Sequence, residues 1–181
     1  MSGQFRLLRE RRFLPFFLTQ FLGAFNDNVY KNALVVLITF QAARLGADSP
    51  GVLVNLAAGV FILPFFLFSA TAGQLADKYE KSRLIRATKL LEIAVMALAV
   101  VGFALMSLPL LLVVLFLMGA QSALFGPVKY AIIPQQLADD ELVGGNALVE
   151  AATFVAILAG TIVGGLLVAG DAGPGRVAVA V

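Results

Sequence analysis

The chain has 181 residues, of which 60% are hydrophobic and 13% are charged, and its formal net charge is +2. A soluble domain contains about 45–50% apolar and about 25% charged residues, and one of this length buries only roughly 70% of its surface. The composition therefore predicts an integral membrane protein. The sequence contains no His and no Cys, which excludes imidazole catalysis, disulfides, cysteine nucleophiles and metal sites built from these residues. We expect no cofactor, no metal and, with so small a net charge, no nucleic-acid partner.

Long stretches without charge mark the expected membrane spans, since a bilayer core of about 30 Å requires about 20 apolar helical residues. Three such runs cover residues 51–76, 93–128 and 151–170, and Pro109, beside Ser107, divides the second run into two spans. The first span is less apolar, and the chain ends shortly after a Gly-rich loop. We predict an all-α integral membrane chain with five complete spans and a truncated sixth, at residues 13–43, 51–76, 84–107, 109–134, 143–170 and from about 176.

The cations are distributed unequally on the two sides of these spans. Nine precede the first span or lie between the second and third spans, against two on the opposite side. Because Lys and Arg concentrate in cytoplasmic loops, this asymmetry predicts a cytoplasmic N-terminus. The first group is Arg6, Arg9, Arg11, Arg12, Lys78, Lys81, Arg83, Arg86 and Lys89, and the second is Arg44 and Arg176.

Ionisable residues inside the expected spans are the first candidates for function, because each costs about 2.5–3.5 kcal/mol at mid-bilayer. Asp27 and Lys31 are four residues apart, so they share a helical face and can partly neutralise each other. Gln20 and Gly23 extend this polar stripe. We expect the stripe to line a bundle interior or a water-filled cavity, or else to join two helices. The candidate path-lining residues are Gln20, Asn26, Asp27, Asn28, Lys31, Lys129 and Glu150.

Three further charges, Glu92, Lys129 and Glu150, are expected at one level of the bundle, from the rise of 1.5 Å per helical residue. A pair of Lys129 with Glu92 or Glu150 would lower the cost of burial, as a static clamp or as a gate. Glu92 alternatively extends toward the basic loop. On the fifth span, Gly160 and Gly164 have the spacing that permits close helix approach.

The segment from Gly73 to Arg83 carries a recognisable motif. It resembles the signature Gly-x-Leu-Ala-Asp-Arg/Lys-x-Gly-Arg/Lys between the second and third helices of the major facilitator superfamily, with Glu80 in place of its second Gly. From the residues alone, Gly73 permits close helix approach, and Asp77 can accept from the N–H groups that open the third span. The resemblance implies a conformational-switch loop that includes Gly73, Asp77, Lys78 and Lys81.

Three other stretches make the resemblance narrower. Residues 21–34, 125–130 and 141–150 resemble the lysophospholipid transporters of that superfamily, whose module also occurs fused ahead of acyltransferase and acyl-ligase domains. The resemblance implies the N-terminal half of a twelve-helix fold, with substrate bound between two halves near the midplane. It also implies inward movement of lysophospholipid across the bacterial inner membrane for re-acylation. The implied partners are lysophospholipid or another amphiphile, the bilayer and the C-terminal half.

Other functions remain open from the residues alone. Proton-coupled efflux of drugs or other amphiphiles would use Asp27 or Glu150 as the titrating group. A membrane anchor for fused acyltransferase domains would leave the polar stripe without a role. An enzyme is not expected, because no nucleophile–base pair can be assembled. For the lipid hypothesis, Lys129 would meet the phosphate as a point charge, and Phe-rich walls would hold the acyl chain.

Overall fold

The computed structural model describes residues 4–45 and 49–169, and these residues are helical apart from short connections. The predicted sixth span and the loop before it lie outside the described residues. In chain order the elements are η1 (Gln4–Arg9), α1 (Leu14–Gln41), η2 (Ala42–Leu45), α2 (Pro50–Lys78), α3 (Lys81–Ala104), α4 (Leu108–Gln136) and α5 (Leu142–Ala169).

Proline stands in the first turn of α1, α2 and α4, where its fixed φ suits the helix. Its missing N–H costs no hydrogen bond there, because N–H groups of the first turn have no partner within the helix. These residues are Pro15, Pro50 and Pro109. Ser107 precedes α4, and Met106, with a φ of 51°, reverses the chain between α3 and α4. The long charge-free run is therefore divided at the position that Pro109 indicates.

The connection between α2 and α3 is shorter than the motif suggests, because α2 continues as helix through Lys78. Glu80 caps α3 and accepts hydrogen bonds from the backbone N–H groups of Ser82 and Arg83, each at 2.9 Å. The expectation that Asp77 would accept from these groups is wrong. The side chain and backbone N–H of Ser82 lower the pKa of Glu80 below its ordinary value.

Gly73 lies within α2, and its expected role is also corrected. A Cβ atom on Gly73 would meet no described atom within 4 Å. The close helix approach that this glycine was expected to permit is therefore absent from the part of the chain that the structure describes. Asp77 and Lys78 are exposed on the last turn of α2, and Lys81 is the first residue of α3.

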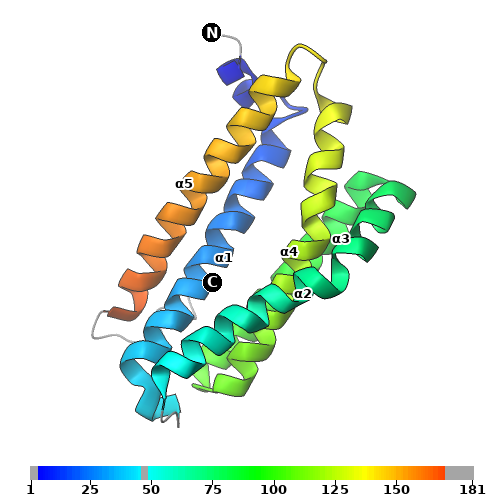
Figure 1. The fold of residues 1–181 in the computed structure, drawn as a ribbon. Coiled ribbons are helices and arrows are strands. Elements are labelled where there is room, and N and C mark those ends of the chain that lie inside the picture. The colour runs from blue at the N-terminus through cyan, green and yellow to red at the C-terminus, as the bar shows by residue number, and fades with distance from the viewer. Residues whose placement is uncertain (1–3, 46–48, 170–181) are drawn as a thin grey trace.

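Helices α1 and α5 pack side by side along most of their length (Figure 1). A Cβ atom on Gly160 would lie 2.5 Å from the carbonyl oxygen of Phe25, and one on Gly164 would overlap the carbonyl oxygen of Val29. The small residues thus bring the two backbones into direct contact. The predicted Gly-xxx-Gly contact is confirmed.

On the other side of α1, α2 and α3 both pack on α4. A Cβ atom on Gly119 of α4 would overlap the carbonyl oxygen of Phe61, so α2 and α4 also approach closely. The main apolar core lies around Tyr30, whose hydroxyl donates to the carbonyl oxygen of Leu111 at 2.7 Å and whose ring meets Phe103 edge-on. We call the surface where the α1–α5 pair faces the α2–α3–α4 group the seam.

Four helices, α2 to α5, are long and apolar enough to cross a membrane. Helix α1 has a comparable length of 28 residues but is not among these four. The reason is chemical, since polar residues between Asn26 and Asn32 lower the hydropathy of its centre. The helix that carries most of the candidate path-lining residues is therefore the one among the five long helices of the described ranges that lacks a continuous apolar stretch of membrane-spanning length.

Candidate functional site

A polar cavity of about 300 Å³ lies in the seam, with walls from all five long helices. We call it the polar cavity. Its lining mixes both signs of charge with amides, hydroxyls and aromatic rings, in a bundle that is otherwise apolar. The lining residues are Gln20, Gly23, Ala24, Asp27, Phe65, Lys89, Glu92, Gln121, Ser122, Phe125, Gly126, Lys129, Tyr130 and Thr153.

Two of the predicted residues of α1 line the polar cavity and are held by neighbouring helices. The hydroxyl of Ser122 donates to Asp27 Oδ2 at 2.9 Å, whereas Asp27 Oδ1 is buried without a hydrogen-bond partner among the described residues. Gln20 is buried, donates to the carbonyl oxygen of Val149 at 3.3 Å and accepts from the Thr153 hydroxyl at 3.1 Å. The cavity thus contains one carboxylate oxygen that no described residue satisfies.

Lys89 is a cavity residue that the sequence analysis placed among the loop cations. It lies on α3, pairs with Glu92 at 2.5 Å and stands 4.6 Å from the centroid of the Phe125 ring. Glu92 also accepts from Gln121 Nε2 at 2.8 Å. A Cβ atom on Gly23 would overlap the Lys89 ammonium, so this glycine makes room for the cation. The i, i+3 spacing of Lys89 and Glu92 was the signal that could have revealed the pair.

Lys129 forms the second ion pair at the polar cavity. Its ammonium lies 3.2 Å from both Glu150 Oε1 and Thr153 Oγ1, and Tyr130 donates to the same carboxylate oxygen at 2.8 Å. Of the two partners considered from the sequence, Glu150 pairs with Lys129, whereas Glu92 pairs within α3. Ser122 and Thr153 were missed, although the dipeptide Gln121–Ser122 is the polar interruption of a long apolar run.

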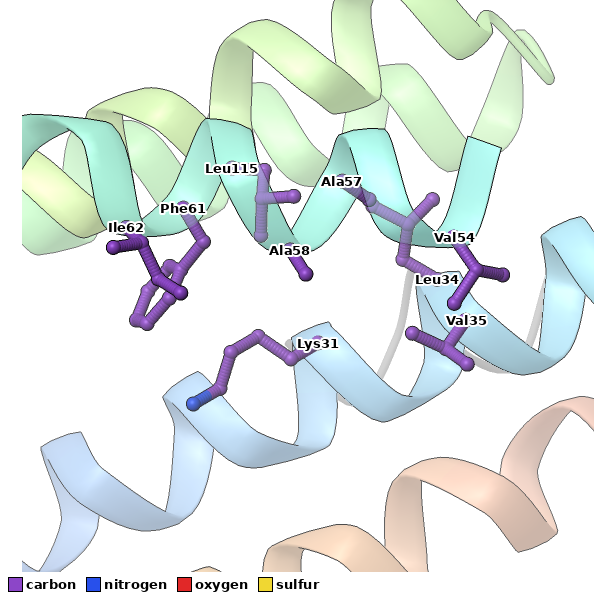
Figure 2. Close-up of a pocket in the computed structure, with 9 residues that line it drawn as sticks. All are labelled: Lys31, Leu34, Val35, Val54, Ala57, Ala58, Phe61, Ile62 and Leu115. Carbon is purple, nitrogen blue, oxygen red and sulfur yellow. The ribbon is translucent and has the colours of Figure 1, made fainter. Parts of the chain in front are cut away.

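Lys31 does not reach the polar cavity and forms no ion pair within the described ranges. It lines a separate apolar pocket of about 210 Å³ between α1 and α2, and its ammonium lies 4.5 Å from the centroid of the Phe61 ring. Figure 2 shows the side chain extending from α1 into the space beside α2. The polar stripe is therefore divided, and the expected neutralisation of Asp27 by Lys31 is not a direct contact. We call this the Lys31 pocket; its lining is Lys31, Leu34, Val35, Val54, Ala57, Ala58, Phe61, Ile62 and Leu115.

The two remaining asparagine candidates face different neighbours. Asn26 lines a groove on the α3 side of α1, together with Lys89 and Glu92. Asn28 is buried at the contact with Gly160 of α5, and its amide donates to the carbonyl oxygen of Ala24 at 2.7 Å. The structure thus brings Gln20, Asp27, Lys129 and its partner Glu150 together, and it does not bring Asn28, Lys31 or the α2–α3 connection to the same cavity.

A third group of charges ties the N-terminal segment to the connection between α4 and α5. Arg12 donates from Nη2 to both carboxylate oxygens of Glu141 at 2.7 Å, from Nη1 to the Gln136 carbonyl oxygen at 2.8 Å, and from Nε to Glu10 at 2.6 Å. The backbone N–H of Ala138 and the Arg12 guanidinium lower the pKa of Glu141 below its ordinary value. We call this the Arg12 cluster.

Long apolar helices around a charged interior cavity define a multi-pass membrane protein. The chain belongs to the Major Facilitator Superfamily, whose sequence profile matches residues 16–178. It is similar to the lysophospholipid transporter LplT of Salmonella newport, Salmonella typhi and Salmonella gallinarum, with 33% identity over 154 residues in each case. The described helices are therefore part of a major facilitator fold, as predicted.

The matched region covers 85% of this chain and 36% of each of these relatives. The chain thus spans about a third of the length of the curated relatives it matches. No solved structure matches the chain.

Proposed function

We propose that this chain is part of a transporter that moves lysophospholipid across the bacterial inner membrane toward the cytoplasmic leaflet, where the lipid is re-acylated. The polar cavity is the observation that carries the proposal. A phosphate-containing headgroup needs polar partners inside the membrane, and the cavity offers the cations Lys89 and Lys129 and hydroxyl groups to the phosphate. The unsatisfied oxygen of Asp27 would accept from a hydroxyl or ammonium group of the headgroup. Similarity to the Salmonella transporter LplT supports the choice of substrate.

The polar cavity offers one surface for the headgroup of a single-chain lipid and another for its acyl chain. Charged and hydroxyl groups gather on the inner faces of α1, α3, α4 and α5, whereas Phe65 and Phe125 supply apolar walls to the same space. A single-chain lipid can therefore place its headgroup among the charges and its acyl chain against the aromatic rings. The α2–α3 connection with Asp77, Lys78 and Lys81 is proposed as the switch, because it carries the superfamily signature.

Transport by the full-length protein reconstituted in liposomes tests the function. Lysophospholipid should cross the membrane faster than in protein-free vesicles, whereas an amphiphilic drug should not. The Lys129→Met variant should transport at least about tenfold more slowly, because a hydrogen bond to a charged group contributes about 1.5–3 kcal/mol. Transport of the drug instead would support the efflux hypothesis, and folded protein that transports neither compound would support a membrane anchor.

We also propose that α1 crosses the membrane together with α2–α5 and that the N-terminus is cytoplasmic. The cation asymmetry supports this orientation. Ser49, exposed immediately before α2, lies on the predicted outer side, and the sequence has no Cys to interfere. A Ser49→Cys variant should react with an impermeant thiol reagent added outside intact cells. Labelling only after permeabilisation would show that Ser49 lies on the cytoplasmic side, so that the proposed orientation is wrong.

A further inference from the structure

Three cations lie inside the helical bundle, and they differ in their partners. Lys89 pairs with Glu92 and Lys129 pairs with Glu150. Lys31 has no carboxylate within ion-pair distance in the described ranges, and its ammonium faces the Phe61 ring. An aromatic face attracts a cation but does not cancel its charge. Among the cations inside the described part of the bundle, Lys31 is therefore the one without a direct ion pair, with Asp27 one turn away attracting it only at longer range.

The surroundings of Lys31 fit an anion that carries an acyl chain. Every other residue lining the Lys31 pocket is apolar, so the pocket offers one charge and a hydrocarbon wall. The pocket opens at its edge, since Ile62 is 50% exposed. A soluble inorganic anion would gain nothing from these walls, whereas a chain beside the anionic group would bury apolar surface there.

We propose that the Lys31 pocket is a second subsite for lysophospholipid, in which Lys31 binds the phosphate and the adjoining acyl segment lies along Ala58 and Ile62 of α2. The inference rests on the proposed lysophospholipid transport and extends it. The polar cavity and the Lys31 pocket then accept the same phosphate at two successive levels of α1. The two levels are separated by one helical turn, the distance from Asp27 to Lys31.

Photocrosslinking tests occupancy of the pocket without relying on transport. A benzophenone amino acid replaces Ile62 in the full-length protein, and the probe is radiolabelled lysophosphatidylglycerol. Phe66, one turn further along α2 and 81% exposed, is the matched control position. Crosslinking at position 62 should exceed that at position 66, and unlabelled lysophosphatidylglycerol should compete. Monoacylglycerol with the same chain, which lacks the phosphate, should compete at least about tenfold less well.

Substitutions of Lys31 assign the effect to its charge. The Lys31→Met variant keeps the length and apolar fit of the side chain and should lower crosslinking at position 62 about tenfold. The Lys31→Arg variant should retain crosslinking, because the guanidinium also binds phosphate. If the Lys31→Met variant does not fold, the competition experiment on the otherwise unchanged protein decides.

The outcomes separate this inference from the proposed function. Lysophospholipid transport with equal competition by the two lipids, or with equal crosslinking at positions 62 and 66, overturns the Lys31 subsite and leaves the transport function standing. If Lys31→Met leaves crosslinking at position 62 unchanged, the Lys31 subsite is also overturned and the transport function stands. That result indicates that Lys31 meets an anion of the protein. Absence of lysophospholipid transport by the unsubstituted protein overturns both proposals.

Discussion

The two sides of helix α1 differ in how they pack against their neighbours and in how their polar side chains are paired. Toward α5, glycines bring the backbones into contact and the amide of Asn32 donates to Thr161 at 3.1 Å. Toward α2, contact is sparse and an apolar pocket contains Lys31, which makes no ion pair with any residue that the structure describes. The polar side chain of Asn32 is satisfied by a close neighbour on the first side, whereas Lys31 on the second side faces the Phe61 ring and no carboxylate of the described residues.

The difference shows why charge inside a bundle is ambiguous evidence for function. A charge with a close partner stabilises or specifies the fold only as part of a pair. A charge without a close partner has no such role in the fold. Lys129 and Lys31 represent these two cases. Substitutions on the two sides of α1 should therefore differ in their effects on stability.

The largest effect is expected on the α5 side. The Gly164→Leu substitution places a side chain against the backbone of Val29, and we expect destabilisation of about 3 kcal/mol, at the upper end of overpacking. Gly165→Leu on the same helix is the matched control, because a Cβ atom there meets no described atom within 4 Å. Thermal denaturation in detergent micelles measures both. Equal stability of the two variants would mean that this contact does not hold α1 to α5.

The second effect distinguishes the paired cation from the unpaired one. Lys129→Met leaves Glu150 without its cation, and we expect a loss of about 2 kcal/mol, less than for a fully buried pair because the Glu150 side chain is 42% exposed. Lys31→Met breaks no direct ion pair of the described residues and should lower stability by less than Lys129→Met does. The same denaturation measurement compares the variants. A larger loss for Lys31→Met would contradict the contrast between the two sides.

A double-mutant cycle sharpens the separation of the two cavities. Asp27→Asn and Lys31→Met should couple less strongly in stability than the hydrogen-bonded pair of Asp27 and Ser122, because Asp27 and Lys31 attract each other only at longer range and make no ion pair in the structure. Ser122→Ala with Asp27→Asn is the positive control, since these residues are hydrogen-bonded. Coupling of Asp27 to Lys31 above about 1 kcal/mol would restore the single polar stripe expected from the sequence.

The smallest effect is expected in the Arg12 cluster, where the charges are paired but exposed to water. Because the pKa of Glu141 is lowered in the folded protein, its stabilisation is present above the ordinary value of about 4.5 and is lost as pH falls through that value and below. Denaturation between pH 7 and pH 4 should show a small loss that Glu141→Gln removes. Asp139→Asn, on the same connection, should keep the loss. If the stability of Glu141→Gln falls with pH as that of the unsubstituted protein does, Glu141 is not the group responsible for the loss.

The sequence predicted the elements of the fold better than the connections within the site. Charge-free runs and Pro109 indicated the helices because burial in lipid requires apolar residues and proline disrupts a continuous helix. The contact of Gly160 and Gly164 followed from spacing alone. The capping role of Glu80 did not, because Asp77 was chosen from its residue type and the sequence does not show that α2 continues through Lys78.

Side-chain partners were predictable only where spacing fixed the possibilities. The pairing of Lys129 with Glu150 joins two helices, and the choice between Glu150 and Glu92 depended on how α3, α4 and α5 are rotated about their axes. Helical periodicity placed Asp27 and Lys31 on one face, but a face is wide enough to border two different cavities. Lys89 was counted among the cations between the second and third spans, although the predicted third span already began at residue 84, and its ion pair therefore escaped notice.

The sparse contact between α1 and α2 has a mechanical consequence. The described chain consists of two closely packed units, the α1–α5 pair and the α2–α3–α4 group, and the boundary between them has fewer close backbone approaches, although the apolar core around Tyr30 spans it. Because both cavities border this boundary, a relative rotation of the units changes both volumes at once, while the glycine contacts within each unit stay intact.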